Sequence, residues 1–77
     1  MSFLASLEKL VGTAGTLLGG PIVPAALEIG KDVVDLLHNA KTVVGTSDVA
    51  ALDTMIADLE PKVMAHADRT EAALRGE

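Results

Sequence analysis

The sequence predicts an all-α protein, a single small domain of three helices. Apolar residues recur every three or four positions along most of the chain. Two clusters of glycine, proline and capping residues divide this pattern. The composition is 49% hydrophobic but includes one aromatic residue and no cysteine, which leaves the aliphatic core of a helix bundle. We expect helices over residues 2–18, 22–41 and 47–75, the second and third packed as an antiparallel hairpin.

The first helix is predicted over residues 2–18, within an apolar, glycine-rich segment that spans residues 1–20. Ser2 has the side chain of a helix N-cap. An apolar stripe follows at helical spacing, and Gly15 and Gly19 add small residues that let another backbone approach closely. We expect this stripe to form an interface with a second copy or with a partner, unless it completes the bundle of its own chain. The stripe and its glycines are Phe3, Leu7, Leu10, Ala14, Leu17, Gly15 and Gly19.

The second helix follows a break at Gly19-Gly20-Pro21, since glycine accepts the left-handed conformation of a C-cap and proline cannot continue the helix. Either Pro21 or Pro24 fits the first turn of the new helix. Residues 21–77 then read as an acidic, amphipathic hairpin. We expect its core to consist of Val33, Leu37, Leu52, Ile56, Leu59 and Val63.

The third helix is predicted over residues 47–75, with Ser47 or Asp48 as its N-cap. Pro61 lies inside it and removes one backbone hydrogen bond, so we expect the helix either to kink or to split there. Arg69 and Arg75 near its C-terminal end complement the helix dipole.

The charge distribution limits the partners that this chain can have. The net charge is -5, and residues 10–27 carry no charge at all. An acidic chain without clustered basic residues is not expected to bind nucleic acid. No secretory signal is recognisable, because a positive segment is missing and Glu8 interrupts the apolar stretch. Glycine and proline in the middle of the uncharged segment disfavour a single membrane span.

The residues that carry chemistry give no catalytic, cofactor-binding or metal-binding pattern. Asp35 and His38 have the spacing of some bundle metal ligands, but no second such pair exists, so we expect a solvent-facing histidine. His66 falls where the apolar seam of the third helix fades. We expect it to mark the point where the seam opens to water; the alternative is a pH-sensitive contact between subunits.

The N-terminal third, with MSFLASL at residues 1–7 and LLGGP at residues 17–21, resembles the start of many small proteins of tailed bacteriophages. That resemblance is compositional. It implies a minor virion or ejection component, or a holin-like membrane protein, and it transfers no functional residue. We expect a location in the cytoplasm or in the virion, with membrane association as the alternative.

The function expected from these features is structural and not enzymatic. The chain has apolar helix faces that a domain of 77 residues is too small to bury. We expect it to self-associate or to dock on another protein of a larger assembly such as a phage particle. The alternative is a holin-like or anchor protein that inserts residues 3–27 into lipid, although interfacial Trp and Tyr are missing.

Overall fold

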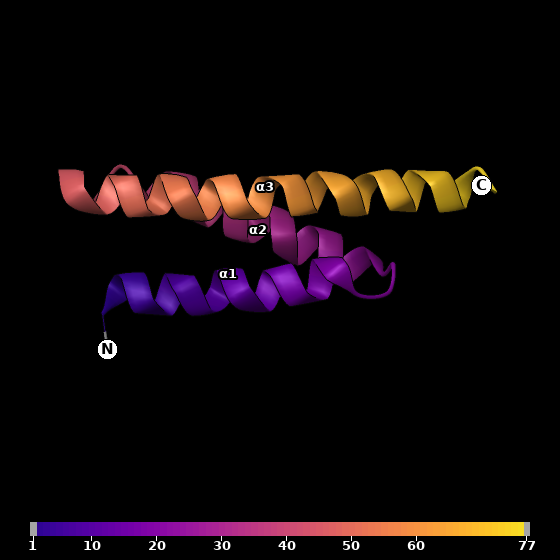
Figure 1. Ribbon diagram of the computed structural model, residues 1–77, viewed down its shortest axis with the longest axis horizontal. Coiled ribbons are helices and arrows are strands. Elements are labelled where there is room, and N and C mark those ends of the chain that lie inside the picture. Colours follow the sequence, from indigo (N-terminus) through magenta and orange to yellow (C-terminus); the bar gives the residue numbers. More distant parts are fainter. Residues whose placement is uncertain (1, 77) are drawn as a thin grey trace.

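The computed structural model describes residues 2–76 and forms three helices. They are α1 (Phe3–Gly19), α2 (Pro24–Ala40) and α3 (Thr46–Leu74). The all-α class is therefore confirmed. The helices run up, down and up, so α1 and α3 have the same direction and α2 is antiparallel to both (Figure 1). As predicted, α2 and α3 pack against each other, and α1 packs against both of them.

The break between α1 and α2 differs in detail from the prediction. Ser2 caps α1 as expected, its side chain accepting a hydrogen bond from the Ala5 N–H at 3.0 Å. At the other end Gly20 is the C-cap with φ -90°, so the expected left-handed glycine is not used. Among the described residues only Gly76 has a positive φ. Helix α2 then begins with Pro24, which selects this proline over Pro21 for the first turn.

Helix α3 begins one residue earlier than predicted and runs through its internal proline. Gly45 is the N-cap and gives no side-chain hydrogen bond, so the expected cap at Ser47 or Asp48 is wrong. Asp48 lies in the first turn, where a carboxylate still favours the helix dipole. The helix is continuous at Pro61, which excludes a split there, and the kink stays a prediction. Pro61 is exposed, so water can satisfy the backbone carbonyl that loses its partner.

The core lies where the three helices meet, and all three contribute to it. Helix α1 therefore completes the bundle of its own chain. Of the predicted hairpin core, five residues are buried and Val63 is partly buried against them. The central cluster consists of Leu7, Val11, Ala14, Leu18, Val33, Leu37, Ala40, Leu52, Met55, Ile56 and Leu59.

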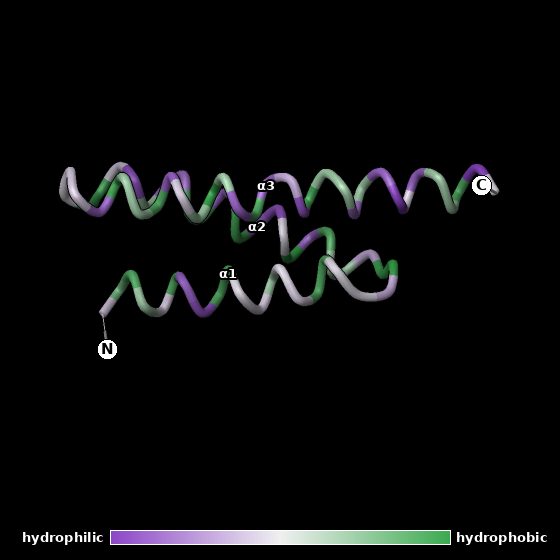
Figure 2. Tube along the Cα trace, viewed as in Figure 1, coloured by the Kyte–Doolittle hydropathy of each residue, from purple (hydrophilic) through white to green (hydrophobic). Residues whose placement is uncertain are grey.

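The bundle is elongated, with dimensions of 46 × 19 × 14 Å. Helix α3 extends past the turn between α1 and α2 (Figure 1). Figure 2 shows that α1 is mostly apolar or neutral along its length, whereas hydrophilic and hydrophobic residues alternate along the second half of α3. A folded chain of 77 residues exposes on average about 4,400 Å², and this one exposes 4845 Å². More surface thus remains uncovered than in an average monomer of this size.

Candidate docking surface

The apolar stripe predicted on α1 divides into two rows with different environments. Leu7 and Ala14 are buried in the core of the chain itself, which corrects the expectation that they form an external interface. Phe3, Leu10 and Leu17 lie seven residues apart and remain between 38% and 53% exposed. These three are the part of the predicted stripe that a partner can reach.

The two glycines of the predicted interface lie outside this exposed row. Gly15 is half-buried beneath the side chain of Lys62 on α3, whose Nζ would be 3.3 Å from a Cβ added to the glycine. Gly19 is exposed at the end of α1, and an added Cβ would meet nothing within 4 Å. Neither glycine therefore mediates close packing of two helix backbones within the chain.

A second row of exposed apolar side chains has the same spacing; it begins in the turn between α1 and α2 and continues along α2. Ile22, Ile29 and Leu36 are seven residues apart and between 40% and 41% exposed. None of these three residues belongs to the predicted interface or to the predicted hairpin core. The sequence feature that could have indicated this row is the recurrence of a large aliphatic residue every seven positions, next to the buried residues of the helix.

The exposed row of α1 is turned toward α2. Gly15 faces Lys62 of α3, and Glu8 and Gly12 line a groove against α3. That side of α1 therefore faces α3. The buried residues of α1 form a line along the helix: Leu7, Val11, Ala14 and Leu18. At 100° per residue, Leu10 and Leu17 lie on the other side of this line from Gly15, which places them beside α2.

The exposed row of α2 is turned toward α1 by the same reasoning. Lys41 pairs with Asp53 of α3, and Gly30 lies against Leu18 and Val63, so this side of α2 faces α3 and the core. The row with Ile29 and Leu36 lies on the other side of the buried line. Both rows therefore border the α1–α2 seam on the face opposite to α3. We call this surface the apolar face: Phe3, Leu10, Leu17, Ile22, Ile29 and Leu36.

The two rows are nearly level with each other across the seam. Leu18 lies opposite Gly30, and the two helices are antiparallel. Leu17 is consequently near the level of Ile29, and Leu10 is near the level of Leu36, one heptad or about 10.5 Å further along. The apolar face thus has a repeat along the bundle axis.

The charges that border the apolar face are unequal on its two helices. Helix α1 carries only Glu8 and Lys9, which cancel. Helix α2 carries three carboxylates and Lys31, a net charge of -3 + 1 = -2. These four side chains of α2 are all exposed, and none forms an ion pair within residues 2–76. The carboxylates belong to Glu28, Asp32 and Asp35.

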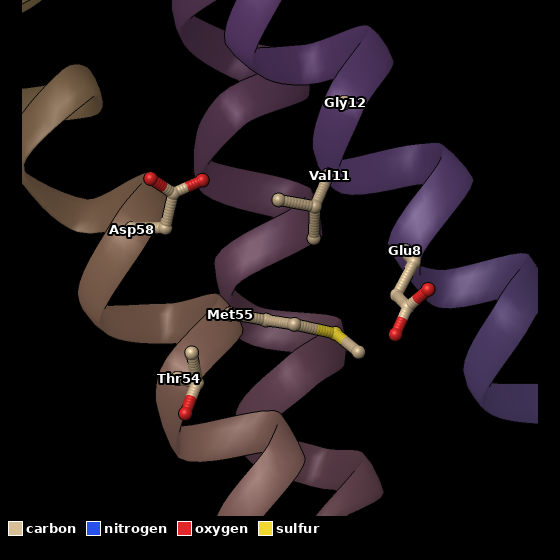
Figure 3. A pocket seen from close by; sticks show the side chains of 6 residues that line it. All are labelled: Glu8, Val11, Gly12, Thr54, Met55 and Asp58. Atoms are coloured by element: carbon tan, nitrogen blue, oxygen red, sulfur yellow. The ribbon is translucent and has the colours of Figure 1, made fainter.

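A shallow groove lies between α1 and α3, on another side of the bundle (Figure 3). Its volume is about 370 Å³. Val11 and Met55 form its apolar floor, and Gly12 leaves space because it lacks a side chain. The carboxylates of Glu8 and Asp58 lie at its edges (Figure 3), and Asp58 already pairs with Lys62 at 3.4 Å. Thr54 also lines the groove, and its hydroxyl donates to the Ala50 carbonyl of its own helix at 3.1 Å.

His66 is completely buried, which corrects the expectation that it marks the opening of the seam to water. Its Nδ1 lies 3.4 Å from the Thr70 hydroxyl, which itself donates to the His66 carbonyl at 2.8 Å. The Nε2 atom is buried and has no hydrogen-bond partner among the described residues. A buried imidazole of this kind is a feature of the core and not of a surface between subunits.

Other chemistry that the sequence raised finds no support in the described part of the chain. His38 is exposed, as expected. Residues 2–76 contain no group of three or more His, Asp or Glu side chains that could hold a metal ion. None of the helices is long and apolar enough to cross a membrane.

Comparison with known proteins returned no relative of this chain. No family model matches it, and neither a curated protein nor a solved structure is significantly similar.

Proposed function

We propose that this chain is a non-enzymatic assembly subunit, a small helical bundle that self-associates through the apolar face of α1 and α2. The observation that carries the proposal is the uncovered heptad-spaced pair of rows, Phe3, Leu10 and Leu17 beside Ile22, Ile29 and Leu36. Isolated exposed apolar residues are normal on protein surfaces, whereas a contiguous patch on one face is typical of an interaction site. Assembly within a phage particle is the setting that the compositional resemblance favours.

The absence of a polar cluster in the apolar face supports a protein partner over a small-molecule ligand. Ligand sites are concave and combine apolar walls with a few converging polar groups. The apolar face instead lies on two helices side by side, each about 25 Å long. In protein interfaces of this shape, side chains of a facing helix pack between the exposed ones.

The test is the mass of the protein in solution, measured by light scattering from about 1 μM to about 1 mM, the range of weak to moderate association. We expect a reversible multimer. Leu10→Gln and Leu36→Gln should each raise the dissociation constant about tenfold, because each removes a central apolar contact. Helical content by circular dichroism should stay unchanged, since both side chains are exposed.

The matched control is Met64→Gln, which makes a similar change at an exposed position of α3. It should leave the dissociation constant unchanged. A wild-type protein that stays monomeric over the whole range would overturn the proposal. Flotation with vesicles of neutral and anionic lipid addresses insertion of residues 3–27 into lipid, and a monomer that floats with vesicles would establish the membrane role instead.

A further inference from the structure

We infer that the occupant of the apolar face is a second copy of this chain, placed so that α1 of each copy lies antiparallel on α2 of the other. This inference rests on the proposed function and specifies its geometry. In the complex, α1 and α2 of both copies form a four-helix bundle around a two-fold axis parallel to the helices. The α3 helix of each copy lies on the outside of this bundle.

The spacing of the apolar face permits this arrangement. A two-fold axis along the bundle keeps every residue at its own level, so the Leu10–Leu36 level of one copy meets the same level of the other. The Leu17–Ile29 level likewise meets its counterpart. At each level the two copies together then place four aliphatic side chains in contact around the axis, as in the core of an antiparallel four-helix bundle.

The area of the face is sufficient for a weak dimer. Two helices of about 25 Å, each about 10 Å wide, give a projected face of about 500 Å². The relief of the side chains adds to this value. Specific interfaces begin near about 600 Å² per partner and have a standard size of about 800 Å². That standard size is about a sixth of the 4845 Å² that the chain exposes.

The charges select this arrangement over its alternative. A two-fold axis across the helices, midway between the two levels, would exchange the levels and place α2 antiparallel on α2. Two helices of net charge -2 would then meet along their acidic borders. Placing α1 of one copy on α2 of the other avoids this repulsion. The uncharged Ser6 and Thr13 and the ammonium group of Lys9 on α1 then face the carboxylates of the other copy's α2.

Lys9 and Asp35 are the charged pair that this geometry brings together across the interface. Both side chains are exposed, and neither has an ion pair within residues 2–76. Each lies about 100° outward from the exposed row on its helix, and their levels differ by about three residues, or about 4.5 Å. A lysine side chain spans that difference. By symmetry the pair occurs twice.

The test measures the dimer dissociation constant of Asp35→Lys, Lys9→Glu and the double variant by analytical ultracentrifugation. Each single variant places like charges at two sites and should raise the dissociation constant about fivefold, within the range of exposed charge pairs. The double variant restores both pairs and should return to within about twofold of wild type. Asp68→Lys, the same change on the outer side of α3, should have no effect.

Two results would overturn the arrangement while leaving the assembly function in place. Tighter association of Asp35→Lys means that α2 lies on α2, where the change removes repulsion. A dimer that none of these charge changes affects uses another surface. A wild-type monomer removes the proposed function itself, and with it the arrangement.

Discussion

At the scale of single residues, the tightest constraint is at Gly30, where α2 passes the side chains of the other two helices. A Cβ at this position would lie 2.9 Å from one Leu18 methyl, 3.0 Å from the other and 3.1 Å from Val63. Leu18 is buried and Val63 is β-branched, so neither can move away freely. At Gly12, in contrast, an added Cβ would meet nothing within 4 Å. Replacing glycine by alanine should therefore cause overpacking at Gly30 but not at Gly12.

We expect Gly30→Ala to lower the free energy of unfolding by about 1 kcal/mol, because overpacking exceeds the gain in helix propensity. Gly12→Ala should raise it by about 0.5–1 kcal/mol through propensity alone. Urea denaturation of the two variants checks both signs. Stabilisation by Gly30→Ala would show that Leu18 and Val63 adjust at little cost.

The buried imidazole of His66 gives a second prediction at this scale. Since the Thr70 hydroxyl donates to the His66 carbonyl, we assign the proton of the neutral ring to Nδ1, where it can donate to the same hydroxyl. This leaves the Nε2 lone pair unpaired in the core. We expect His66→Leu to raise the free energy of unfolding by about 1–2 kcal/mol, because it removes an unsatisfied polar atom.

The control for this change is His38→Leu, at an exposed position, which should alter stability by less than about 0.5 kcal/mol. Thermal denaturation of both variants measures the difference. A loss of stability in His66→Leu would indicate that Nε2 has a hydrogen-bond partner in the folded protein, such as an internal water.

At the scale of elements, Arg69 connects α3 to the end of α1. Its guanidinium donates to the Leu18 carbonyl at 3.3 Å and to the Gly20 carbonyl at 2.6 Å. These oxygens lack partners within their own helix, since the last carbonyls of a helix have no following N–H groups. Arg69 thereby supplies donors to the end of α1, which is consistent with the absence of a left-handed glycine at Gly20. The sequence suggested only an effect of Arg69 on the dipole of α3.

We expect Arg69→Met to lower the free energy of unfolding by about 1 kcal/mol. This loss is smaller than that of a buried charged hydrogen bond, because the Arg69 side chain is partly in water. Arg75→Met removes an exposed pair with Glu71 and should cost less than about 0.5 kcal/mol. Hydrogen exchange near Leu18 should increase in Arg69→Met alone. Equal effects of the two changes would refute the link to α1.

At the scale of the whole molecule, self-association and folding stability are coupled by mass action. Only folded chains form the dimer, so a higher protein concentration favours the folded state. For a domain of this size we expect the melting temperature to rise by about 3–5 °C for each tenfold increase in concentration above the dissociation constant. Calorimetry at several concentrations measures this slope. Leu10→Gln should flatten it, and a wild-type protein with no slope would exclude stabilisation by a dimer.

The sequence by itself determined the number of helices, their limits to within a few residues, the Ser2 cap and the aliphatic composition of the core. These features depend on local periodicity, capping groups and proline, which act within a few residues. The hairpin core could be predicted because Leu52, Ile56 and Leu59 form a narrow apolar seam on a largely polar helix.

Only the tertiary structure decided which part of the wide apolar surface of α1 is buried. Its apolar residues cover an arc broader than one packing contact, and the positions of α2 and α3 select the line through Leu7 and Leu18 over the row with Leu10 and Leu17. The same holds for Arg69 and His66. Their partners and burial come from helix packing and from residues up to 51 positions away in sequence, and local patterns do not encode such contacts.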